Sequence, residues 1–387
     1  MKSLSNSAAT IRDYDNTHFM HPWEGMAEFG SADRTISASA EGIYVYDQNG
    51  RKLIDGPGGM WCSQIGYARQ DMVMKLSYNS PWNTASAPPA LLAKKLADLA
   101  PGDLNTVFFT TGGSTAVDTA IRFMHFYNNR LGRRDKKIVL SRVRAYHGST
   151  YLSASVTGLA SGGVIIPPPG YHKRTLELCH KYDILYISDE VVTAFGRLGH
   201  WFASKDVFDI QPDMITCAKG ITSGYLPLGA CLISDRLLEP ISGEGHENKF
   251  FNNGYTYSGH PVSCAAALKN IEIIENEKIL EHVRAISPRF MEKLNALRDL
   301  PNIGDTRGMG LVGCVEAAVD PSDDQTRAER LQAFGNKVDQ KCEELGLIVR
   351  PLGHMCVFSP PLVITEGQID DMFAILSEAI RLVATEF

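Results

Sequence analysis

Two short apolar runs in the middle of the chain each end at a side chain that could do chemistry. Residues 184–187 (Ile-Leu-Tyr-Ile) lead into Ser188 and Asp189, and residues 214–218 (Met-Ile-Thr-Cys-Ala) lead into Lys219. Runs this short and this apolar are typical of strands covered on both faces of a parallel sheet. Because ligands of open α/β sheets bind outside the carboxyl ends of the strands, we expect Asp189 and Lys219 to face one crevice.

An acid and an amine delivered to one crevice suit the cofactor pyridoxal phosphate (PLP). A lysine holds its aldehyde as a Schiff base, and a carboxylate keeps its pyridine nitrogen protonated, so that the ring accepts electrons. An ordinary ion pair at a sheet edge would use the same two residue types. Asp189 and Lys219 alone leave both interpretations open.

Composition and charge exclude several other classes. The 387 residues are 44% hydrophobic, which allows a large core, and the length predicts two or three domains. The net charge is −6 and basic residues do not alternate with aromatic ones, so we expect no nucleic acid partner. No apolar run reaches membrane-spanning length, and residues 1–16 lack the apolar centre of a signal peptide.

The eight cysteines are scattered and include no C-x-x-C pair. Their spacing favours neither a zinc site nor a disulfide framework, and it is typical of a reducing compartment. We therefore expect a cytoplasmic enzyme with no membrane association and no metal site. The cysteines are Cys62, Cys179, Cys217, Cys231, Cys264, Cys314, Cys342 and Cys356.

A glycine turn between a strand and a helix predicts a phosphate site. Residues 106–110 have a strand pattern, residues 111–114 (Thr-Gly-Gly-Ser) a tight turn, and residues 115–128 a helical pattern. Such a turn presents backbone N–H groups at the positive end of the helix. A further strand is expected at 138–140, directly before residues 145–150 (Ala-Tyr-His-Gly-Ser-Thr).

The remaining pattern is a hairpin followed by an α+β region. Residues 41–55 read as a β-hairpin, whereas residues 1–30 lack periodicity and suit an arm lying on another surface. Helical spacing over 261–300 is interrupted at Pro288. We further expect a helix over 89–100, strands at 310–316, 347–350 and 355–359, and a last helix opened by a capping box of Thr365 and Gln368.

Six segments in order resemble the class III (ω-amino acid) aminotransferases, and among these the amine or ω-amino acid:pyruvate enzymes. A single segment could match by chance, but six in this order are highly specific. The resemblance extends from about Pro22 to the last helix. The segments are FFTTGGSTAVDTAIR, RAYHGSTYLSAS, DILYISDEVVTAFGRLG, PDMITCAKGITSGYLPLGA, NNGYTYSGHPVSCAAAL and LIVRPLG.

The resemblance implies the α/β architecture of the PLP-dependent transferase fold type I. A large domain with a mostly parallel sheet binds PLP, and a small α+β domain combines both chain ends. Residues 1–58 would form an N-terminal arm and hairpin that join the small domain. Residues 59–280 would form the large domain, and residues 281–387 the C-terminal small domain.

Position by position, the resemblance assigns three catalytic residues. Lys219 would be the Schiff-base lysine, whose amine then moves the proton between substrate and cofactor. Asp189 would pair with the pyridine nitrogen, and Tyr146 would stack on one face of the ring. From residue types alone, a surface lysine and a buried core tyrosine stay open.

The resemblance also assigns contacts to the cofactor. Val191 would press on the other ring face, unless it is plain core packing, and Gly113 and Ser114 would bind the phosphate. Relatives have Ser-Gly-Ser-Glu at 112–115, so a side-chain contact is lost here while the backbone N–H groups remain. Thr256 matches a threonine that reaches the phosphate of the partner subunit. A homodimer with shared active sites, or a tetramer of such dimers, is implied.

Two residues are implied to contact substrate. Trp61 would wall the amine pocket, and Arg350 would bind the carboxylate of the keto acid with its two-pronged guanidinium. Arg350 would swing away for an apolar amine, because an unpaired buried charge is costly. A core tryptophan and a surface salt bridge are the alternatives from residue types alone.

The implied activity is transamination from a primary amine or ω-amino acid to an α-keto acid, with pyruvate the expected acceptor. Other PLP chemistry on the same fold, as in an aminomutase or a decarboxylating transaminase, stays open. So does a truncated, non-catalytic relative. Formation of alanine that depends on pyruvate separates the first interpretation from the others.

Two stretches are shorter than the resemblance implies. After residues 151–158, relatives continue for several dozen residues that include a sheet strand, and at 70–77 they have a full helix. A protein that lost an interior strand would have an open sheet edge. We therefore expect that segments are missing at both places and that the residue numbers run on continuously across the gaps. The sign of this would be a step longer than ~3.8 Å between consecutive Cα atoms within 158–162 and within 70–74.

Overall fold

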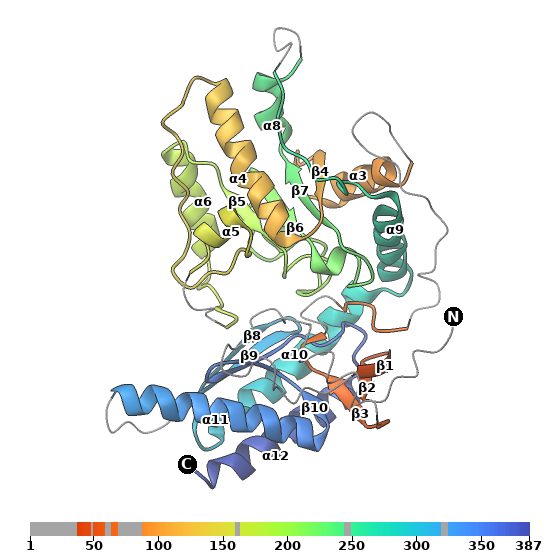
Figure 1. Cartoon of the computed structure of the whole chain (residues 1–387), viewed down its shortest axis with the longest axis vertical. Helices are drawn as coiled ribbons and strands as arrows, with labels where there is room; N and C mark the ends of the chain where they lie inside the picture. The colour runs from red at the N-terminus through yellow and green to blue at the C-terminus, as the bar shows by residue number, and fades with distance from the viewer. Residues whose placement is uncertain are drawn as a thin grey trace, which may run out of the picture.

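The computed structural model describes most of the chain in several ranges, and Figure 1 shows an upper part and a lower part. The predictions for the arm at 1–30, for Trp61 and for the Cα step at 70–74 lie outside the described residues. The predicted step at 158–162 also falls on residues outside them, apart from Gly158. The described ranges are 37–47, 49–58, 63–68, 87–158, 163–243, 249–318 and 324–387.

The upper part is built on one four-stranded sheet, in the order β4-β7-β6-β5. β5 and β6 are parallel, but β7 runs antiparallel to both β4 and β6. Strands β4, β5 and β6 therefore run in the same direction, so the predicted mostly parallel sheet is confirmed for the described strands, with β7 as the reversed strand. The link from β6 to β7 contains only a short 3-10 turn and no helical crossover, which a parallel pair would need. The strands are β4 (Thr106–Thr110), β5 (Ile187–Asp189), β6 (Met214–Cys217) and β7 (Gly229–Ile233).

Helices cover both faces of this sheet, and every residue of β6 is buried. Met214 packs in a cluster with Phe123 of α4, whereas its neighbour Ile215 packs in a second cluster with Leu92 of α3 and Ile271 of α9. Successive strand residues point to opposite faces, so both faces of β6 are buried. The predicted helices at 115–128 and 89–100 are confirmed as α4 (Gly113–Arg130) and α3 (Ala87–Leu99), and α9 spans Pro261–Asn276.

The lower part joins the start of the described chain to its end. The predicted hairpin is confirmed as β2 (Tyr44–Asp47) and β3 (Lys52–Asp55), with β1 (Ser37–Glu41) beside it. β3 pairs in parallel with β10 (Leu347–Ile348). Ile43 and Ile54 share one hydrophobic core with residues of the last helices. The hairpin therefore packs with the C-terminal residues, as Figure 1 shows for β2, β3 and β10.

A second sheet of the lower part is wholly antiparallel, in the order β11-β12-β9-β8. Three long helices pack with it and the hairpin, and the predicted capping box of Thr365 and Gln368 is confirmed at the start of the last one. The elements are β8 (Ile303–Met309), β9 (Val312–Ala317), β11 (Arg350–Leu352), β12 (Met355–Phe358), α10 (Ile279–Ala296), α11 (Asp324–Leu345) and α12 (Glu366–Ala384).

Three local predictions were wrong. α10 continues through Pro288, because the residues of its buried face pack into the core and offset one lost hydrogen bond. The helical run breaks instead at Lys278, whose φ is 51°. Residues 138–140 form no strand, and Ile184 is 40% exposed rather than buried. The short elements are α5 (Tyr151–Ser155), α6 (Tyr171–Lys181), α7 (Ala203–Asp206), α8 (Asp235–Leu238), η2 (Lys219–Ile221), η3 (Glu239–Ile241) and η4 (Leu297–Asp299).

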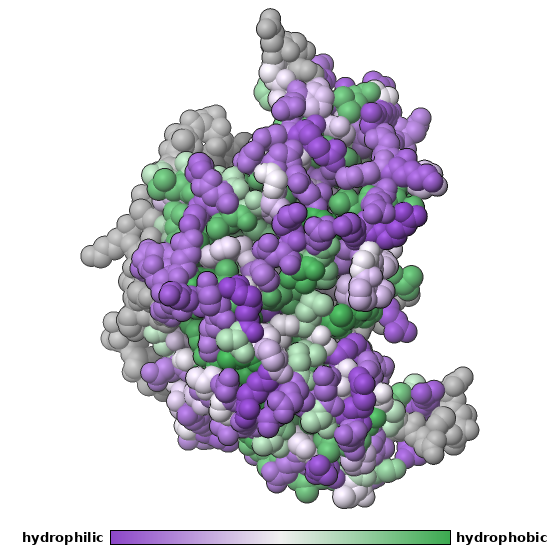
Figure 2. Space-filling model, turned by 180° about the vertical axis from the view of Figure 1, so that it is seen from behind, coloured by the Kyte–Doolittle hydropathy of each residue, from purple (hydrophilic) through white to green (hydrophobic). Residues whose placement is uncertain are grey.

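No helix within the described ranges is both long enough and apolar enough to cross a membrane. Figure 2 shows the rear face, where hydrophilic and hydrophobic residues are interspersed outside the grey segments.

Candidate active site

Asp189 ends strand β5 with its carboxylate held by three groups. The Thr216 hydroxyl donates a 3.0 Å hydrogen bond to Oδ1, and the Val191 N–H donates a 3.2 Å bond to the same oxygen. His147 Nδ1 lies 2.6 Å from Oδ2. The side chain is 16% exposed, so it reaches a surface while its neighbours fix its direction. Such a carboxylate suits a fixed partner cation better than a solvated ion pair.

Lys219 follows the adjacent strand β6 and starts the turn η2. Thr216 lies opposite Asp189 in the ladder, so the two strands bring the acid and the lysine to the same edge of the sheet. Lys219 is half-buried, whereas residues 212–218 and 220–223 around it are fully buried. Its φ of 47° is uncommon for a residue with a side chain, and such backbone strain is typical of functional sites.

A buried asparagine on α9 supports the turn after Lys219. The Asn270 amide donates hydrogen bonds of 2.9 Å to Gly220 O and 3.1 Å to Ile221 O, and its oxygen accepts a 2.7 Å bond from the Ser223 hydroxyl. The sequence did not predict this role, because asparagine in a helix has no distinctive spacing. Asn270 therefore holds the backbone that carries Lys219.

The predicted phosphate turn lies at the start of α4. The N-cap residue Gly112 gives no side-chain hydrogen bond, so side chains do not cap the first N–H groups. Ser149 N–H donates a 3.1 Å hydrogen bond to Ser114 Oγ, and the Thr150 hydroxyl donates one of 3.2 Å to Ser114 O. The turn thus lies against residues 148–150, and the Ser114 hydroxyl hydrogen is directed elsewhere. An anion would find several donors here.

Val191 contacts both the glycine turn at the start of α4 and the carboxylate of Asp189. A Cβ atom added to Gly113 would lie 2.9 Å from Val191 Cγ1, closer than real Cβ contacts. The same addition at Gly112 would meet nothing within 4 Å. Glycine is therefore needed at 113 but not at 112, and the turn, Val191 and Asp189 form one constellation.

His147 is a site residue that the sequence analysis did not assign. It sits between the predicted Tyr146 and the buried Gly148, and its main-chain N–H donates a 2.9 Å hydrogen bond to Thr157 Oγ1. That bond and the 2.6 Å contact with Asp189 fix the ring. The sequence does contain a signal for His147 as a site residue, because it directly follows the predicted site residue Tyr146.

Glu190 has a structural role although it adjoins Asp189. Its carboxylate accepts hydrogen bonds of 2.6 Å from Ala203 N and 2.9 Å from Ser204 N, which anchors the start of α7. Burial raises the pKa of Glu190 above its usual value, while these hydrogen bonds act in the opposite direction. The two adjacent acids therefore point to different places, one to the site and one to the core.

The other predicted site residues have fewer contacts with the group formed by Asp189, Lys219 and the glycine turn. Tyr146 is 41% exposed and precedes His147. Thr256 is exposed in a loop that contacts α4, where the Tyr255 hydroxyl donates a 3.2 Å bond to Thr115 O. Arg350 lies in the lower sheet on β11, and its charge partly offsets the burial that raises the pKa of Asp339 to about 6. Trp61 lies outside the described residues.

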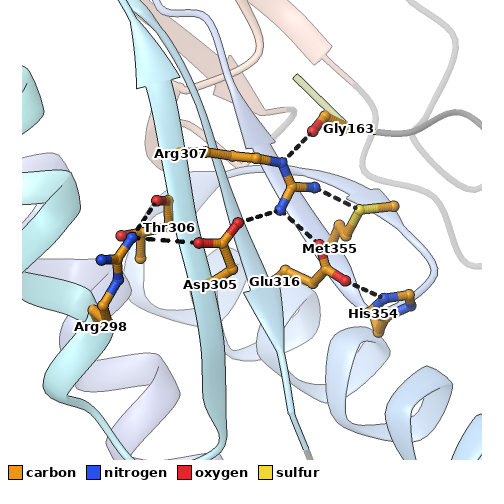
Figure 3. A network of polar contacts seen from close by, with 8 residues as sticks. All are labelled: Gly163, Arg298, Asp305, Thr306, Arg307, Glu316, His354 and Met355. Carbon is orange, nitrogen blue, oxygen red and sulfur yellow. Dashed lines mark hydrogen bonds and ion pairs between the residues drawn. The ribbon is translucent and has the colours of Figure 1, made fainter. Parts of the chain in front are cut away.

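A second arginine links the lower sheet to residues just after the described range ending at 158. Arg307 Nε donates a 2.9 Å hydrogen bond to Gly163 O (Figure 3). Its Nη1 lies 2.8 Å from Asp305 Oδ2 and 2.6 Å from Glu316 Oε2, so two carboxylates match its charge. These contacts help to lower the pKa of Glu316 against the effect of burial. Arg307 therefore anchors Gly163 rather than offering a charge to substrate.

The described residues fit PLP. A fixed carboxylate can pair with a protonated ring nitrogen, a half-buried lysine can hold an aldehyde, and an uncapped helix start can bind a phosphate. Asp189, Lys219 and residues 113–114 supply these three features, and Val191 joins the first to the third.

Comparison with known proteins agrees with this geometry. The family model described as "Aminotransferase class-III" matches residues 30–161 and 159–380. The chain is 35% identical to gamma aminobutyrate transaminase 1 of Solanum lycopersicum, over 90% of this chain and 82% of the relative. It is 32% identical to the putrescine–pyruvate aminotransferase of Pseudomonas aeruginosa, over 92% of this chain and 93% of the relative.

Solved structures show the same fold. An (S)-enantioselective omega-transaminase from Thermomicrobium roseum superposes with a TM-score of 0.91 and 29% identity, covering 98% of this chain and 99% of that one. The fold and the site define a PLP-dependent enzyme of fold type I. Within that class, the chain belongs to the class III aminotransferases. It is an enzyme that transfers an amino group from an amine to a keto acid.

The comparisons also show that this chain is shorter than a relative within the matched region. The alignment with the S. lycopersicum enzyme extends over 423 residues, more than the 387 of the whole chain. The relative therefore has residues within the matched region that this chain lacks. The family match also divides in two at 159–161, one of the two places where the sequence analysis predicts missing residues.

Proposed function

We propose that this aminotransferase moves an amino group from a primary amine or ω-amino acid to pyruvate, with Lys219 and Asp189 at the centre of its site. The observation that carries the proposal is the position of these residues at the ends of the adjacent parallel strands β5 and β6. PLP supplies an electron-accepting ring when it is bound. The protein supplies the groups that bind, orient and move protons.

Each residue has a distinct role in the proposal. Lys219 would hold the cofactor through its amine and then carry the proton to and from the substrate carbon. Asp189, fixed by His147 and Thr216, would keep the ring nitrogen protonated. Tyr146 and Val191 would cover the two ring faces.

The phosphate would be bound at the start of α4. Gly113 and Ser114 would donate N–H groups and a hydroxyl, and the loop at 148–150 that contacts Ser114 would close one side. We further propose that Thr256, exposed on its loop, reaches the phosphate of a partner subunit in a homodimer.

The substrate class is proposed from both the residues and the relatives. Arg350 would bind the keto-acid carboxylate and Trp61 would border the amine. The relatives carry gamma-aminobutyrate and putrescine–pyruvate in their names. A short ω-amino acid or diamine is therefore the proposed donor, and pyruvate the proposed acceptor.

The proposed organisation follows the predicted boundaries. Residues 59–280 form the cofactor domain, and residues 1–58 join 281–387 in the small domain, which the pairing of β3 with β10 supports. A cytoplasmic location is proposed because the seven described cysteines are free thiols.

The test is a transamination assay of the PLP-loaded protein. Putrescine or 4-aminobutanoate is supplied with pyruvate or with 2-oxoglutarate, and alanine and glutamate are measured. Alanine that forms only when both amine and pyruvate are present is the expected result. Glutamate formation alone would overturn the choice of acceptor, and consumption of amine without any acceptor would favour other PLP chemistry.

A further inference from the structure

Arg197 is a fully buried arginine in the segment that links β5 to α7. Its Nη1 donates hydrogen bonds of 3.0 Å to Leu311 O and 2.6 Å to Pro360 O. Its Nη2 donates a hydrogen bond of 2.6 Å to Oε1 of Gln64. A buried charge is stable only when hydrogen bonds replace its hydration, so these contacts fix the guanidinium in one place.

Gln64 is also fully buried, and Arg197 determines which way its amide points. Because Oε1 accepts a hydrogen bond from the guanidinium, Nε2 is directed away from it. Nε2 donates a hydrogen bond of 3.4 Å to Phe195 O. A Cβ atom added to Gly220 would lie 2.7 Å from the same nitrogen. The amide therefore rests directly on the residue that follows Lys219.

Gly220 is held by contacts from three separate segments. The added Cβ would also lie 3.0 Å from Phe195 Cβ, so this position has no room for a side chain. The carbonyl oxygen of Gly220 accepts a 2.9 Å hydrogen bond from Asn270 on α9. Gln64 and Phe195 thus contact the Cα side of Gly220, while Asn270 binds its carbonyl group.

Two residues at this contact have a left-handed backbone conformation. The φ angle is 47° at Lys219 and 57° at Phe195. Such a conformation costs free energy in a residue with a side chain, and it persists only where surrounding contacts require it. The Gln64 amide contacts the carbonyl group of Phe195 and the residue after Lys219. It is therefore placed to hold both turns together.

Arg197 also connects this contact to the lower part of the molecule. Leu311 directly precedes β9, and Pro360 follows β12; both strands belong to the sheet that includes Arg350. The Leu311 N–H donates a 3.1 Å hydrogen bond back to Arg197 O. The guanidinium therefore links the turn of Lys219 to the sheet that carries the proposed carboxylate-binding arginine.

We propose that Arg197 is a positioning residue which, through the Gln64 amide, holds Lys219 in the strained conformation that directs its amine to the cofactor. The inference rests on the proposed role of Lys219. Arginine suits the task because its rigid fork of donors binds several oxygens at once, which a lysine amine cannot reproduce. Without this support the amide can rotate, and the turn can relax to a conformation of lower free energy.

Gln64→Met tests the proposal, because methionine fills a similar volume but makes neither hydrogen bond of the amide. In the full chain before PLP is added, the amides of Ile221 and Thr222, which donate within the turn, should exchange about tenfold faster. Exchange of the amides in β7 should not change. Asn128→Leu, which removes a buried amide that donates to Met124 O on α4, is the control and should leave the turn unchanged.

Kinetics of the PLP-loaded enzyme give a second readout. In Gln64→Met, kcat should fall about tenfold while KM for pyruvate stays unchanged, because Lys219 moves protons but does not bind the acceptor. Arg197→Lys should have the same effect. Since both residues act through one amide, Arg197→Lys should lower kcat no further in the Gln64→Met background.

Unchanged exchange at 221–222 in Gln64→Met would overturn the proposal, even if activity falls. Equal acceleration throughout β7 would also overturn it, because it would indicate a general loss of stability, and so would additive effects of the two substitutions on kcat. If Arg197→Lys does not fold, exchange in Gln64→Met decides alone. The proposed function fails separately, if borohydride fixes PLP of the unchanged enzyme on a lysine other than Lys219.

Discussion

His147 Nδ1 and Asp189 Oδ2 lie 2.6 Å apart, although His147 lies in a loop and Asp189 ends strand β5, 42 residues further along the chain. The other oxygen of Asp189 accepts hydrogen bonds from Thr216 and from the Val191 N–H. The carboxylate therefore has no freedom to rotate toward solvent, and its direction is set before any ligand arrives. Such preorganisation is what an acid that must face a ring nitrogen requires.

Replacing His147 by asparagine should lower kcat by about 10- to 100-fold, the range that corresponds to a charge-assisted hydrogen bond. The reason is that Asp189 loses one of its orienting partners. The pH dependence of kcat should also change, which a purely structural role would not cause. His125→Asn on α4, whose ring contacts Lys137 O, is the control and should keep both the rate and the pH profile. An unchanged pH profile for His147→Asn would contradict the positioning role.

Replacing Asp189 by asparagine should lower kcat by about 100-fold or more, because the amide has a similar shape but cannot stabilise a protonated ring nitrogen. The same change at Asp206, an exposed acid near His200, should have no effect on rate. Activity within a few-fold of the unchanged enzyme would show that Asp189 does not face the cofactor.

The two glycines at the start of α4 should respond differently to alanine. Gly113→Ala forces a Cβ to 2.9 Å from Val191, so we expect weaker PLP binding and a loss of about 1–3 kcal/mol in the free energy of unfolding. Gly112→Ala meets open space and is the matched control. PLP titration and thermal unfolding of both variants measure the difference.

A second substitution checks whether the clash with Val191 causes the loss of stability in Gly113→Ala. Val191→Ala in the Gly113→Ala background removes the atoms that clash, and it should restore part of the lost stability. Equal behaviour of the two glycine variants would show that the turn and Val191 are not in contact.

Acid should destabilise the enzyme partly through His172. Burial, with a contribution from the Arg142 charge, lowers the pKa of His172 from 6.5 to about 4. At a pH between these two pKa values, the His172 ring is protonated in the unfolded chain but neutral in the folded protein. The free energy of unfolding therefore falls as the pH drops from 6.5 to about 4. Since the ring is partly exposed, we expect the effect between pH 7 and pH 5 to be about 1 kcal/mol.

His172→Gln should remove this part of the pH dependence, which denaturant unfolding at several pH values measures. His180→Gln, at the other end of the same helix α6, serves as the comparison. Identical pH slopes for His172→Gln and the unchanged protein would contradict the contribution assigned to His172.

The sequence was informative where local pattern and chemistry coincide. The glycine turn before α4, the strand before Lys219 and the capping box at Thr365 each have a local signal, and each was found. Direction of pairing has no such signal, so the antiparallel course of β7 was missed. Pro288 was misleading because the burial of α10 outweighs a local preference.

Within the site, the chemistry of Asp189 and Lys219 could be predicted because each charged group ends an apolar run. The supports could not be predicted in this way. His147 and Asn270 act through contacts between segments far apart in the chain, and only the fold brings them together. The exposed residues Ile138 and Leu140 show the reverse case, since their strand pattern is real but no described neighbour pairs with it.

The most direct test of the Lys219 assignment is to load the protein with PLP, reduce it with borohydride and map the modified peptide by mass spectrometry. We predict a single pyridoxyl group on the amine of Lys219, and its loss in Lys219→Ala but not in Lys205→Ala, an exposed lysine on α7. A modification found on another lysine, or one that persists in Lys219→Ala, would contradict the assignment of Lys219 as the residue that holds the cofactor.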